Sequence, residues 1–246
     1  MSELLIFAAL LIGAYLLGSV PLAFWVVKWA RGIDLREYGS GNVGFTNVAA
    51  STSIWLAIPV LIFDVGKGAL AVYITRWLGF SLPLQGIVGI AAVAGHNWPV
   101  FLNFNAGRGL MTTIGVVLAL VPKAAGVLIL ISFLGIPFHL LSLTSLVCVF
   151  MVTLVIWFST LPPFDWLTGV PLGNDRLAMT MVFLALWLVT VIRRITVPPS
   201  SLSQTVSPGR LIFNRFVFDR DISDRKAWLN RTPVRKIPKT GENNSK

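Results

Sequence analysis

The sequence has few charged residues, few acidic residues and almost no cysteine. Only 12% of its 246 residues are charged, whereas roughly a quarter of the residues of a soluble globular domain carry charge. This shortage excludes an ordinary soluble domain. The single cysteine, Cys148, excludes an internal disulfide, and its position inside an apolar run indicates a packing role.

What the sequence has instead is long apolar segments, with 55% hydrophobic residues and a mean hydropathy of +0.79. The first run is not a cleavable signal, because an acidic Met-Ser-Glu flank precedes it and it is too long. A full span needs about 20 residues, so the shorter runs predict tilted, short or sheltered helices. We predict an all-α, polytopic integral membrane protein with about seven transmembrane helices and cytoplasmic glycine-rich loops. The runs cover approximately residues 4–27, 53–63 continuing to 80, 84–95, 110–121, 124–138, 140–161 and 177–192.

Positive charge gathers at the C-terminal end. Residues 191–246 hold 12 of the 20 Lys and Arg residues but 4 of the 10 acidic ones. By the positive-inside rule this predicts a cytoplasmic C-terminus. The acidic N-terminus, with Lys28 and Arg31 at the end of the first span, places the N-terminus outside, and the two positions together require an odd number of crossings. We expect a transmembrane domain at 1–195 and a basic cytoplasmic tail at 196–246 that lies on the anionic inner leaflet. We expect no nucleic-acid partner for this basic tail.

A glycine-rich polar stretch at residues 39–47 reads Gly-Ser-Gly-Asn-Val-Gly-Phe-Thr-Asn. Non-helical backbone at membrane depth must be buried in protein or line a wet cavity. Ser40 and Thr46 offer hydroxyl groups, and Asn42 and Asn47 offer both donors and acceptors. A tight turn is the simpler interpretation, but this connection is longer than the two to eight residues or so that usually join helices. Its length favours a function.

A second polar stretch at residues 94–109 begins near His96 and ends in Gly107-Arg108-Gly109. It runs into an apolar segment, so we expect backbone N–H groups of a helix N-terminus beside the Arg108 guanidinium. Such an arrangement suits phosphate. A lone histidine at the end of a span is often only an interfacial side chain, although the loop that follows favours a place for His96 in the site.

Two further polar features have a structural and a functional interpretation. Asp64 and Lys67 lie three residues apart on one side of a predicted helix. They are either an ion pair that neutralises its own charges, or they face a cavity in which Lys67 holds an anion and Asp64 orients it. Ser142 stands at a third cytoplasmic connection, where a hydroxyl can equally bond the preceding helical turn.

At these residues the chain resembles the bacterial acyl-phosphate:glycerol-3-phosphate acyltransferase family, in order over about residues 10–150. The resemblance implies an integral enzyme of the bacterial inner membrane with seven spans, no metal ion and no cofactor. It implies that glycerol 3-phosphate, fatty acyl phosphate and membrane lipids are its partners and that lysophosphatidate is formed. The matching segments are Gly18–Pro21 with Lys28, Asp34–Arg36, Gly39–Asn47, Asp64–Gly68, Gly95-His96, Pro99–Leu102, Phe104, Gly107–Gly109 and Ser142–Ser145.

The resemblance gives Ser40 and Thr46 to the active-site loop, with Asn42 and Asn47 as neighbours, and residues 107–109 to the glycerol phosphate loop. His96 is the histidine near both loops and is our candidate proton acceptor. The predicted catalytic residues are therefore Ser40, Asn42 and His96. The predicted substrate-binding residues are Thr46, Asn47, Lys67, Gly107, Arg108, Gly109 and Ser142, and no metal ligand is predicted.

The chain also departs from the family pattern. Arg108 stands where the family usually has lysine, Ala106 where it has glycine, and Ala50 where it has arginine. The last family span ends in His-x-x-Asn, whereas residues 192–195 here read Ile-Arg-Arg-Ile. The tail is longer than the family ending.

Three functions are consistent with these observations. The first is acyl transfer, in which an acyl phosphate already carries its leaving group, so positioning supplies much of the acceleration. The second is a non-catalytic relative that binds phosphate or lipid, which the departures favour. The third is a small membrane transporter using Asp64, Lys67 and His96, although paired halves with matching interruptions are not evident.

Overall fold

A computed structural model describes residues 2–138, 140–169 and 173–229, and in these ranges the chain is helical with no strand. The all-α prediction is confirmed for the described residues. The α-helices are α1 (Glu3–Ser19), α2 (Leu22–Arg31), α3 (Phe45–Ser51), α4 (Ile54–Trp77), α5 (Leu82–Asn97), α6 (Leu110–Leu120), α7 (Pro122–Ser132), α8 (Leu141–Trp157), α9 (Phe164–Thr168), α10 (Arg176–Ile195), α11 (Pro208–Phe218) and α12 (Arg225–Leu229). Short 3-10 turns are η1 (Leu35–Glu37), η2 (Val100–Leu102), η3 (Phe133–Gly135), η4 (Gly173–Asp175) and η5 (Ser201–Thr205).

Three helical segments are long and apolar enough to cross a membrane: Glu3–Arg31, Ile54–Trp77 and Gly173–Ile195. The first apolar run is divided, because Pro21 has no N–H to continue the ladder and α2 starts after it. Shorter apolar helices occupy Leu110–Leu120, Pro122–Gly135 and Leu141–Trp157, so the short-helix expectation fits the runs at 110–121, 124–138 and 140–161.

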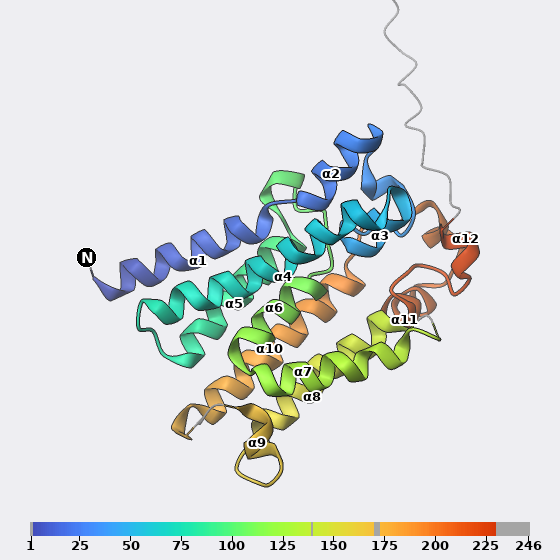
Figure 1. Ribbon diagram of the computed structural model, residues 1–246. Coiled ribbons are helices and arrows are strands. Elements are labelled where there is room, and N and C mark those ends of the chain that lie inside the picture. The colour runs from blue at the N-terminus through green and yellow to red at the C-terminus, as the bar shows by residue number, and fades with distance from the viewer. Residues whose placement is uncertain (1, 139, 170–172, 230–246) are drawn as a thin grey trace, which may run out of the picture.

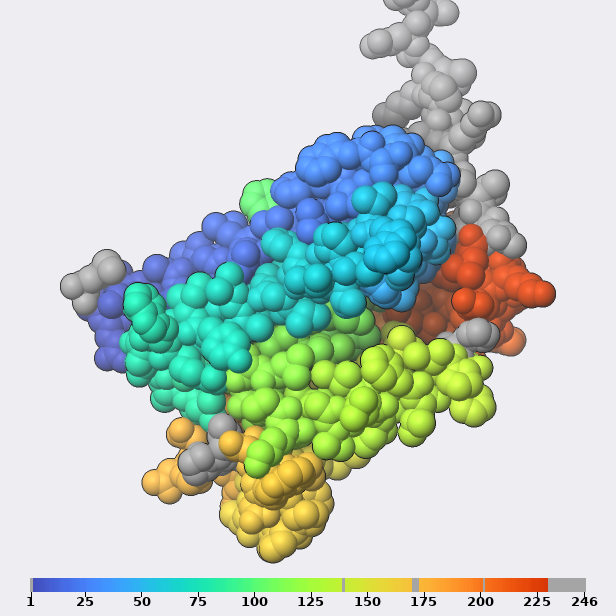
Figure 2. All heavy atoms as spheres, viewed as in Figure 1, coloured from blue at the N-terminus to red at the C-terminus, as the bar shows by residue number. Residues whose placement is uncertain are grey.

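The helices form a bundle with two distinct ends (Figure 1). The start of α1 and helix α9 lie at one end, and α2, α3, α11 and α12 lie at the other. The space-filling view shows the spheres of α2 and α3 and those of the C-terminal helices at this same end (Figure 2). The connections around residues 32–53 and the segment 196–229 therefore lie at the same end of the bundle.

Glycines let two helix pairs meet backbone to backbone. A Cβ at Gly18 of α1 would overlap the Ala92 carbonyl of α5, and a Cβ at Gly95 would overlap the Tyr15 carbonyl. A similar close approach joins α4 and α6. Small residues at crossings are how membrane helices gain packing when lipid tails are as apolar as leucine. These contacts fix α5, and with it His96, against α1.

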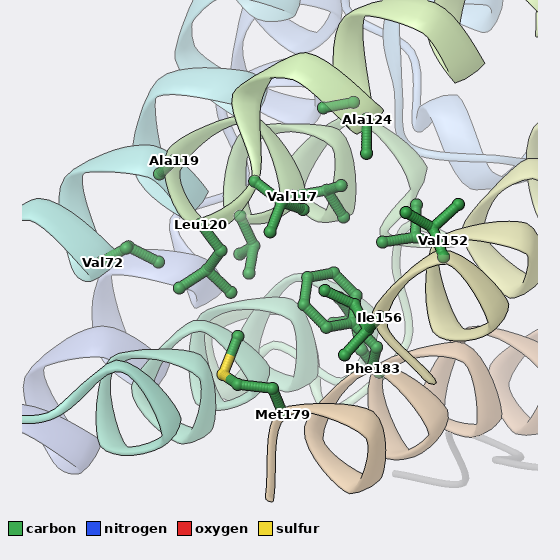
Figure 3. Close-up of a cluster of buried hydrophobic side chains, with 14 of the residues drawn as sticks. Val72, Val117, Ala119, Leu120, Ala124, Val152, Ile156, Met179 and Phe183 are labelled. Atoms are coloured by element: carbon green, nitrogen blue, oxygen red, sulfur yellow. The ribbon is translucent and has the colours of Figure 1, made fainter. Parts of the chain in front are cut away.

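The main core lies where α4, α6, α7, α8 and α10 converge (Figure 3). Leu120, Ile156 and Phe183 are fully buried there. A second cluster underlies the polar end, and it includes Val43 from the first glycine-rich stretch and Leu102 and Ala106 from the second. Apolar packing thus holds the two stretches together.

Candidate functional site

The first glycine-rich loop is built around the side chain of Asn47, which is 2% exposed. Its Nδ2 donates to the carbonyl oxygens of Leu35, Tyr38 and Asn42 at 3.0 to 3.2 Å. Its Oδ1 accepts from the backbone N–H of Ser40 at 3.2 Å. The Asn47 amide is therefore fully engaged by the loop itself. The Asn47 side chain therefore sets the shape of the loop. Its Nδ2 is already engaged and leaves no free donor for the predicted direct contact with substrate.

The other polar residues of this loop remain accessible to a ligand. The Ser40 hydroxyl oxygen accepts from the Asn42 backbone N–H at 3.3 Å, and both residues are half-buried. Asn42 Oδ1 is buried and has no hydrogen-bond partner among the residues that the structure describes. Because an unpaired buried carbonyl costs about 1–3 kcal/mol, it is poised to accept a hydrogen bond. Thr46 is exposed on the first turn of α3.

A buried group of charged side chains joins α4 to α5. Lys67 Nζ lies 2.9 Å from Asp64 Oδ1, and His96 Nδ1 lies 3.5 Å from the same oxygen. All three side chains are more than nine-tenths buried. Asp64 and Lys67 thus form the pair that their spacing predicts, and His96 adds a third member from the end of α5.

A small polar cavity of about 10 Å³ lies beside this group, with room for about one water molecule. Gly107 lines it, and a Cβ there would overlap the His96 imidazole, so the loop packs directly on the ring. Three predicted site residues, Lys67, His96 and Gly107, therefore meet around one cavity. Val43 is the residue of the first glycine-rich stretch that reaches it. Ser40, Asn42 and Thr46 are not among the residues that line it.

The second loop is held by Arg193, which sequence reasoning did not select. Its Nε donates to the Gly107 carbonyl at 3.0 Å, and its Nη2 donates to the Ala106 carbonyl at 3.0 Å and to Asn105 Oδ1 at 3.3 Å. Arg193 is 2% exposed at the end of α10. An arginine buried at the end of an apolar span is costly unless it is paired. An arginine at the end of an apolar span could therefore have been selected from the sequence as a residue with a buried polar partner. In the sequence, residues 192–195 stood out only as a departure from the family pattern.

Beyond Gly107 the loop turns into α6. Gly109 has a φ of +69° and precedes the first residue of α6, so the predicted helix N-terminus follows the loop directly. A Cβ at Gly109 would overlap the Asn97 side chain. Glycine is therefore required both for the left-handed backbone and for space.

Arg108 points to a second polar group, centred on Asp219. Arg108 Nη1 lies 2.6 Å from Asp219 Oδ2, and the Ser142 hydroxyl donates to the same oxygen at 3.1 Å. Arg194 Nε lies 3.3 Å from Asp219 Oδ1. Two predicted binding residues, Arg108 and Ser142, thus meet through an acidic residue that sequence reasoning missed. Nothing in the local pattern pointed to it, because it lies 111 residues from Arg108 along the chain.

The segment that carries Asp219 is anchored to the end of α10. Arg194 Nε donates to the Arg215 carbonyl at 3.0 Å, and Arg215 Nη1 donates to the Ile195 carbonyl at 2.8 Å. The Arg215 guanidinium also pairs with Asp221 at 2.7 Å. Burial raises the pKa of the Asp221 carboxyl, but hydrogen bonds from Arg215 and Ser200 outweigh burial and hold the pKa below its ordinary value. The described part of the predicted tail is therefore packed on the site, and residues 230–246 lie outside the described residues.

A small apolar cavity of about 30 Å³ lies between α6, α7 and α8. Ser145, one turn along α8 from Ser142, lines it together with Cys148 and aliphatic residues. An apolar cavity therefore begins one helical turn along α8 from Ser142, which belongs to the Arg108 group.

The chain matches a family model described as glycerol-3-phosphate acyltransferase over residues 8–202. The chain belongs to this family. Glycerol-3-phosphate acyltransferase 4 of Dehalococcoides mccartyi strain CBDB1 is 39% identical over 234 residues, covering 92% of this chain and 94% of the relative. The glycerol-3-phosphate acyltransferase of Halalkalibacterium halodurans is 36% identical over 191 residues, covering 72% of this chain and 85% of the relative.

Two solved structures have the same fold. Both are crystal structures of PlsY, an integral membrane glycerol 3-phosphate acyltransferase. The glycerol 3-phosphate form has a TM-score of 0.65 and 27% identity, covering 85% of this chain and 93% of PlsY. The lysophosphatidic acid form has a TM-score of 0.62 and 28% identity, covering 76% and 87%. The resemblance seen in the sequence is confirmed, and this glycerol-3-phosphate acyltransferase family member is a multi-pass membrane protein.

In this family member six of the ten predicted residues therefore fall into three places. Lys67, His96 and Gly107 surround the polar cavity, Arg108 and Ser142 meet at Asp219, and Gly109 starts α6 between them. The residues of the first loop form a neighbouring unit, which Arg36 Nη1 links to the Leu102 carbonyl of the second loop at 3.4 Å. Ser40, Asn42, Thr46 and Asn47 belong to that unit.

Proposed function

We propose that this protein is a membrane acyltransferase that moves a fatty acyl group from an acyl phosphate to the 1-hydroxyl of glycerol 3-phosphate. The product is lysophosphatidate for phospholipid synthesis. The observation that carries the proposal is the loop Gly107–Gly109. It joins the cavity of Lys67 and His96 to the Arg108 group, which lies near the apolar cavity. Family membership and the ligands named for the two PlsY forms support the same substrates.

We propose that the chain crosses the bacterial inner membrane about seven times, with the N-terminus outside and the C-terminus in the cytoplasm. Support comes from the bundle end that carries α2, α3, α11 and α12, and from the basic residues of the C-terminal segment (Figure 1). On this arrangement both glycine-rich loops meet water at the inner membrane face, and we treat residues 1–195 as the transmembrane domain and 196–246 as its cytoplasmic extension.

In the reaction the glycerol hydroxyl attacks the acyl carbon, its proton is removed, and inorganic phosphate leaves. Asp64 beside Nδ1 of His96 favours the proton on that nitrogen, which leaves Nε2, on the Gly107 side, to accept the hydroxyl proton. The departing phosphate is a second acceptor for this proton. Lys67 keeps the buried Asp64 carboxylate compensated.

Arg108 binds the phosphate of glycerol 3-phosphate, and the N–H groups at the start of α6 stabilise charge on the departing phosphate. In this proposal the Ser40 hydroxyl and the unpaired Asn42 Oδ1 of the neighbouring first loop contact the glycerol hydroxyl groups. The apolar cavity between α6, α7 and α8 holds part of the acyl chain. No covalent enzyme intermediate is needed, because the acyl phosphate is already activated.

The proposal is tested with purified protein in liposomes, given acyl phosphate and labelled glycerol 3-phosphate. We expect lysophosphatidate and inorganic phosphate in equal amounts. Arg108→Ala should raise the KM for glycerol 3-phosphate by about tenfold or more, because a charge-assisted contact is worth roughly 1.5–3 kcal/mol. Arg210→Ala removes an equal charge from an exposed position of α11 and should leave the KM unchanged.

Three results would contradict the proposal. Tight glycerol 3-phosphate binding without product would indicate a non-catalytic binding protein. Flux of glycerol 3-phosphate into vesicles without product would indicate a transporter. An Arg108→Ala variant with an unchanged KM would remove that residue from the site.

A further inference from the structure

Asp219 occupies a position that an anionic ligand would be expected to take. Its carboxylate contacts the Arg108 guanidinium at 2.6 Å, the Ser142 hydroxyl at 3.1 Å and Arg194 Nε at 3.3 Å. These three groups come from the second glycine-rich loop, α8 and α10. Arg194 donates its Nε–H to the Arg215 carbonyl, so its contact with Asp219 is an ion pair without a hydrogen bond. Two guanidinium groups and a hydroxyl around two oxygens form the arrangement that binds carboxylate and phosphate alike.

The charges around Asp219 favour a dianion over a single carboxylate. Arg108 and Arg194 both face it, and within the described part of the chain no other carboxylate lies within ion-pair distance of either arginine. Asp221 is engaged by Arg215, and Arg193 is engaged by the loop carbonyls. The pair of guanidinium groups therefore retains one positive charge that Asp219 does not neutralise.

A further donor at this position is unused. Arg194 Nη2 is buried and has no hydrogen-bond partner among the described residues, and the Arg194 side chain is 5% exposed. A buried N–H of a charged group without an acceptor costs more free energy than an unpaired neutral group does. A phosphate has more acceptor oxygens than a carboxylate and would satisfy it.

Asp219 is the residue at which the chain leaves helix α11. It ends α11 with a φ of +60°, in the left-handed region that residues other than glycine, asparagine and aspartate seldom adopt. Its side chain therefore projects from the last turn of a short helix rather than from a membrane span. Moving it requires adjustment of this helix end and no change in the bundle.

We propose that Arg108, Ser142 and Arg194 form a site for a phosphate monoester dianion, and that Asp219 occupies it as an internal ligand in the substrate-free protein. The incoming phosphate displaces the carboxylate, because two like charges a few ångströms apart in a half-buried site repel strongly. This inference rests on the proposed function only in assigning Arg108 to a substrate phosphate. Asp219 lies beyond residue 202, where the family-model match ends.

The test is calorimetric titration of the full-length protein in detergent with inorganic phosphate. Asp219→Asn should bind phosphate about tenfold or more tightly than the wild type, because apparent affinity falls by the fraction of sites that are open. Asn also tolerates the left-handed backbone, so the variant should fold. Asp224→Asn removes the same charge from an exposed residue of this segment and should bind like the wild type. Asp219→Glu keeps the charge and should not tighten binding.

Two further measurements identify the ligand and report the displacement of Asp219. Titration with glycerol 3-phosphate and with a non-transferable acyl phosphonate reports which substrate gains affinity in Asp219→Asn. In the wild type, inorganic phosphate should increase tryptic cleavage after Arg220 relative to chloride at equal ionic strength, since displacement of Asp219 loosens the end of α11. This second measurement needs no variant.

The inference is overturned if Asp219→Asn binds phosphate equally or more weakly, or if Asp219→Glu tightens binding as much as Asp219→Asn does. It is also overturned if phosphate protects the wild type from cleavage. If acyl transfer is normal but any of these overturning results appears, the role of Asp219 as an internal ligand is rejected and the proposed function stands. If Asp219→Asn gains phosphate affinity but no lysophosphatidate forms, the proposed function fails and the anion site stands.

Discussion

The contact between Gly107 and the His96 ring joins the second glycine-rich loop to the end of α5. At this scale composition and spacing pointed to the glycines, His96 and Arg108, and their catalytic and binding roles stay predictions. The hydrogen-bond partners could not be predicted. Asn47 takes its role at the centre of a loop from carbonyls 5 to 12 residues before it, and Asp219 takes its role from an arginine 111 residues away.

Replacing Gly107 with alanine tests whether the ring position matters. The added Cβ overlaps the His96 imidazole, so either the ring or the loop must shift. We expect kcat to fall by about tenfold or more, since displacement of a catalytic group by about an ångström can cost two orders of magnitude. Steady-state kinetics on lysophosphatidate formation measures it.

Gly126→Ala is the matched control for Gly107→Ala. Gly126 lies in α7 with no atom within 4 Å of an added Cβ, so its replacement should leave kcat at the wild-type value. A Gly107→Ala enzyme with wild-type kcat and KM would show that catalysis does not depend on the observed position of the His96 ring.

Helices were the most predictable level of this fold. Apolar runs at 84–95, 110–121 and 177–192 fall on α5, α6 and α10, because burial in lipid or core requires continuous hydrophobicity. The first run is divided at Pro21, and the sequence analysis treated it as one. The docking of α11 was missed, because its anchors are backbone carbonyls and buried ion pairs that leave no periodic pattern.

The crossing of α1 and α5 depends on Gly18. In Gly18→Ala the added methyl group meets the Ala92 carbonyl, so the helices must separate. We expect a loss of about 1–3 kcal/mol in unfolding free energy, measured by denaturation in detergent. Gly13→Ala on the same helix meets no atom within 4 Å and should be neutral. Equal stability of the two variants would contradict the close crossing.

The anchoring of α11 should depend on pH through Asp221. Its folded pKa lies below the ordinary value, so its stabilising effect is complete above that value and is lost as the pH falls through the folded pKa. The protection of residues 208–218 against hydrogen exchange, relative to the intrinsic rate at each pH, should therefore be equally strong at neutral and mildly acidic pH and should fall at strongly acidic pH. Asp221→Asn should remove this dependence and leave protection weak throughout. Strong protection in that variant would show that other contacts hold the helix.

For the whole molecule, hydropathy and charge carried the prediction of an all-helical membrane protein, and the inner-face arrangement remains a proposal. Site-directed labelling tests it in a Cys148→Ala background, using cysteines at three exposed positions, Thr46, Asn174 and Lys226. A membrane-impermeant maleimide should reach positions 46 and 226 from the cytoplasmic side and position 174 from the other. Labelling of 46 and 226 from opposite sides would contradict the single polar face.

Arg193 closes the second loop from the last apolar span, 86 residues after Gly107. During synthesis, residues 105–109 leave the ribosome long before their anchor exists. The catalytic pocket can therefore mature only when the final span has inserted, so nascent or prematurely terminated chains remain inactive in the membrane.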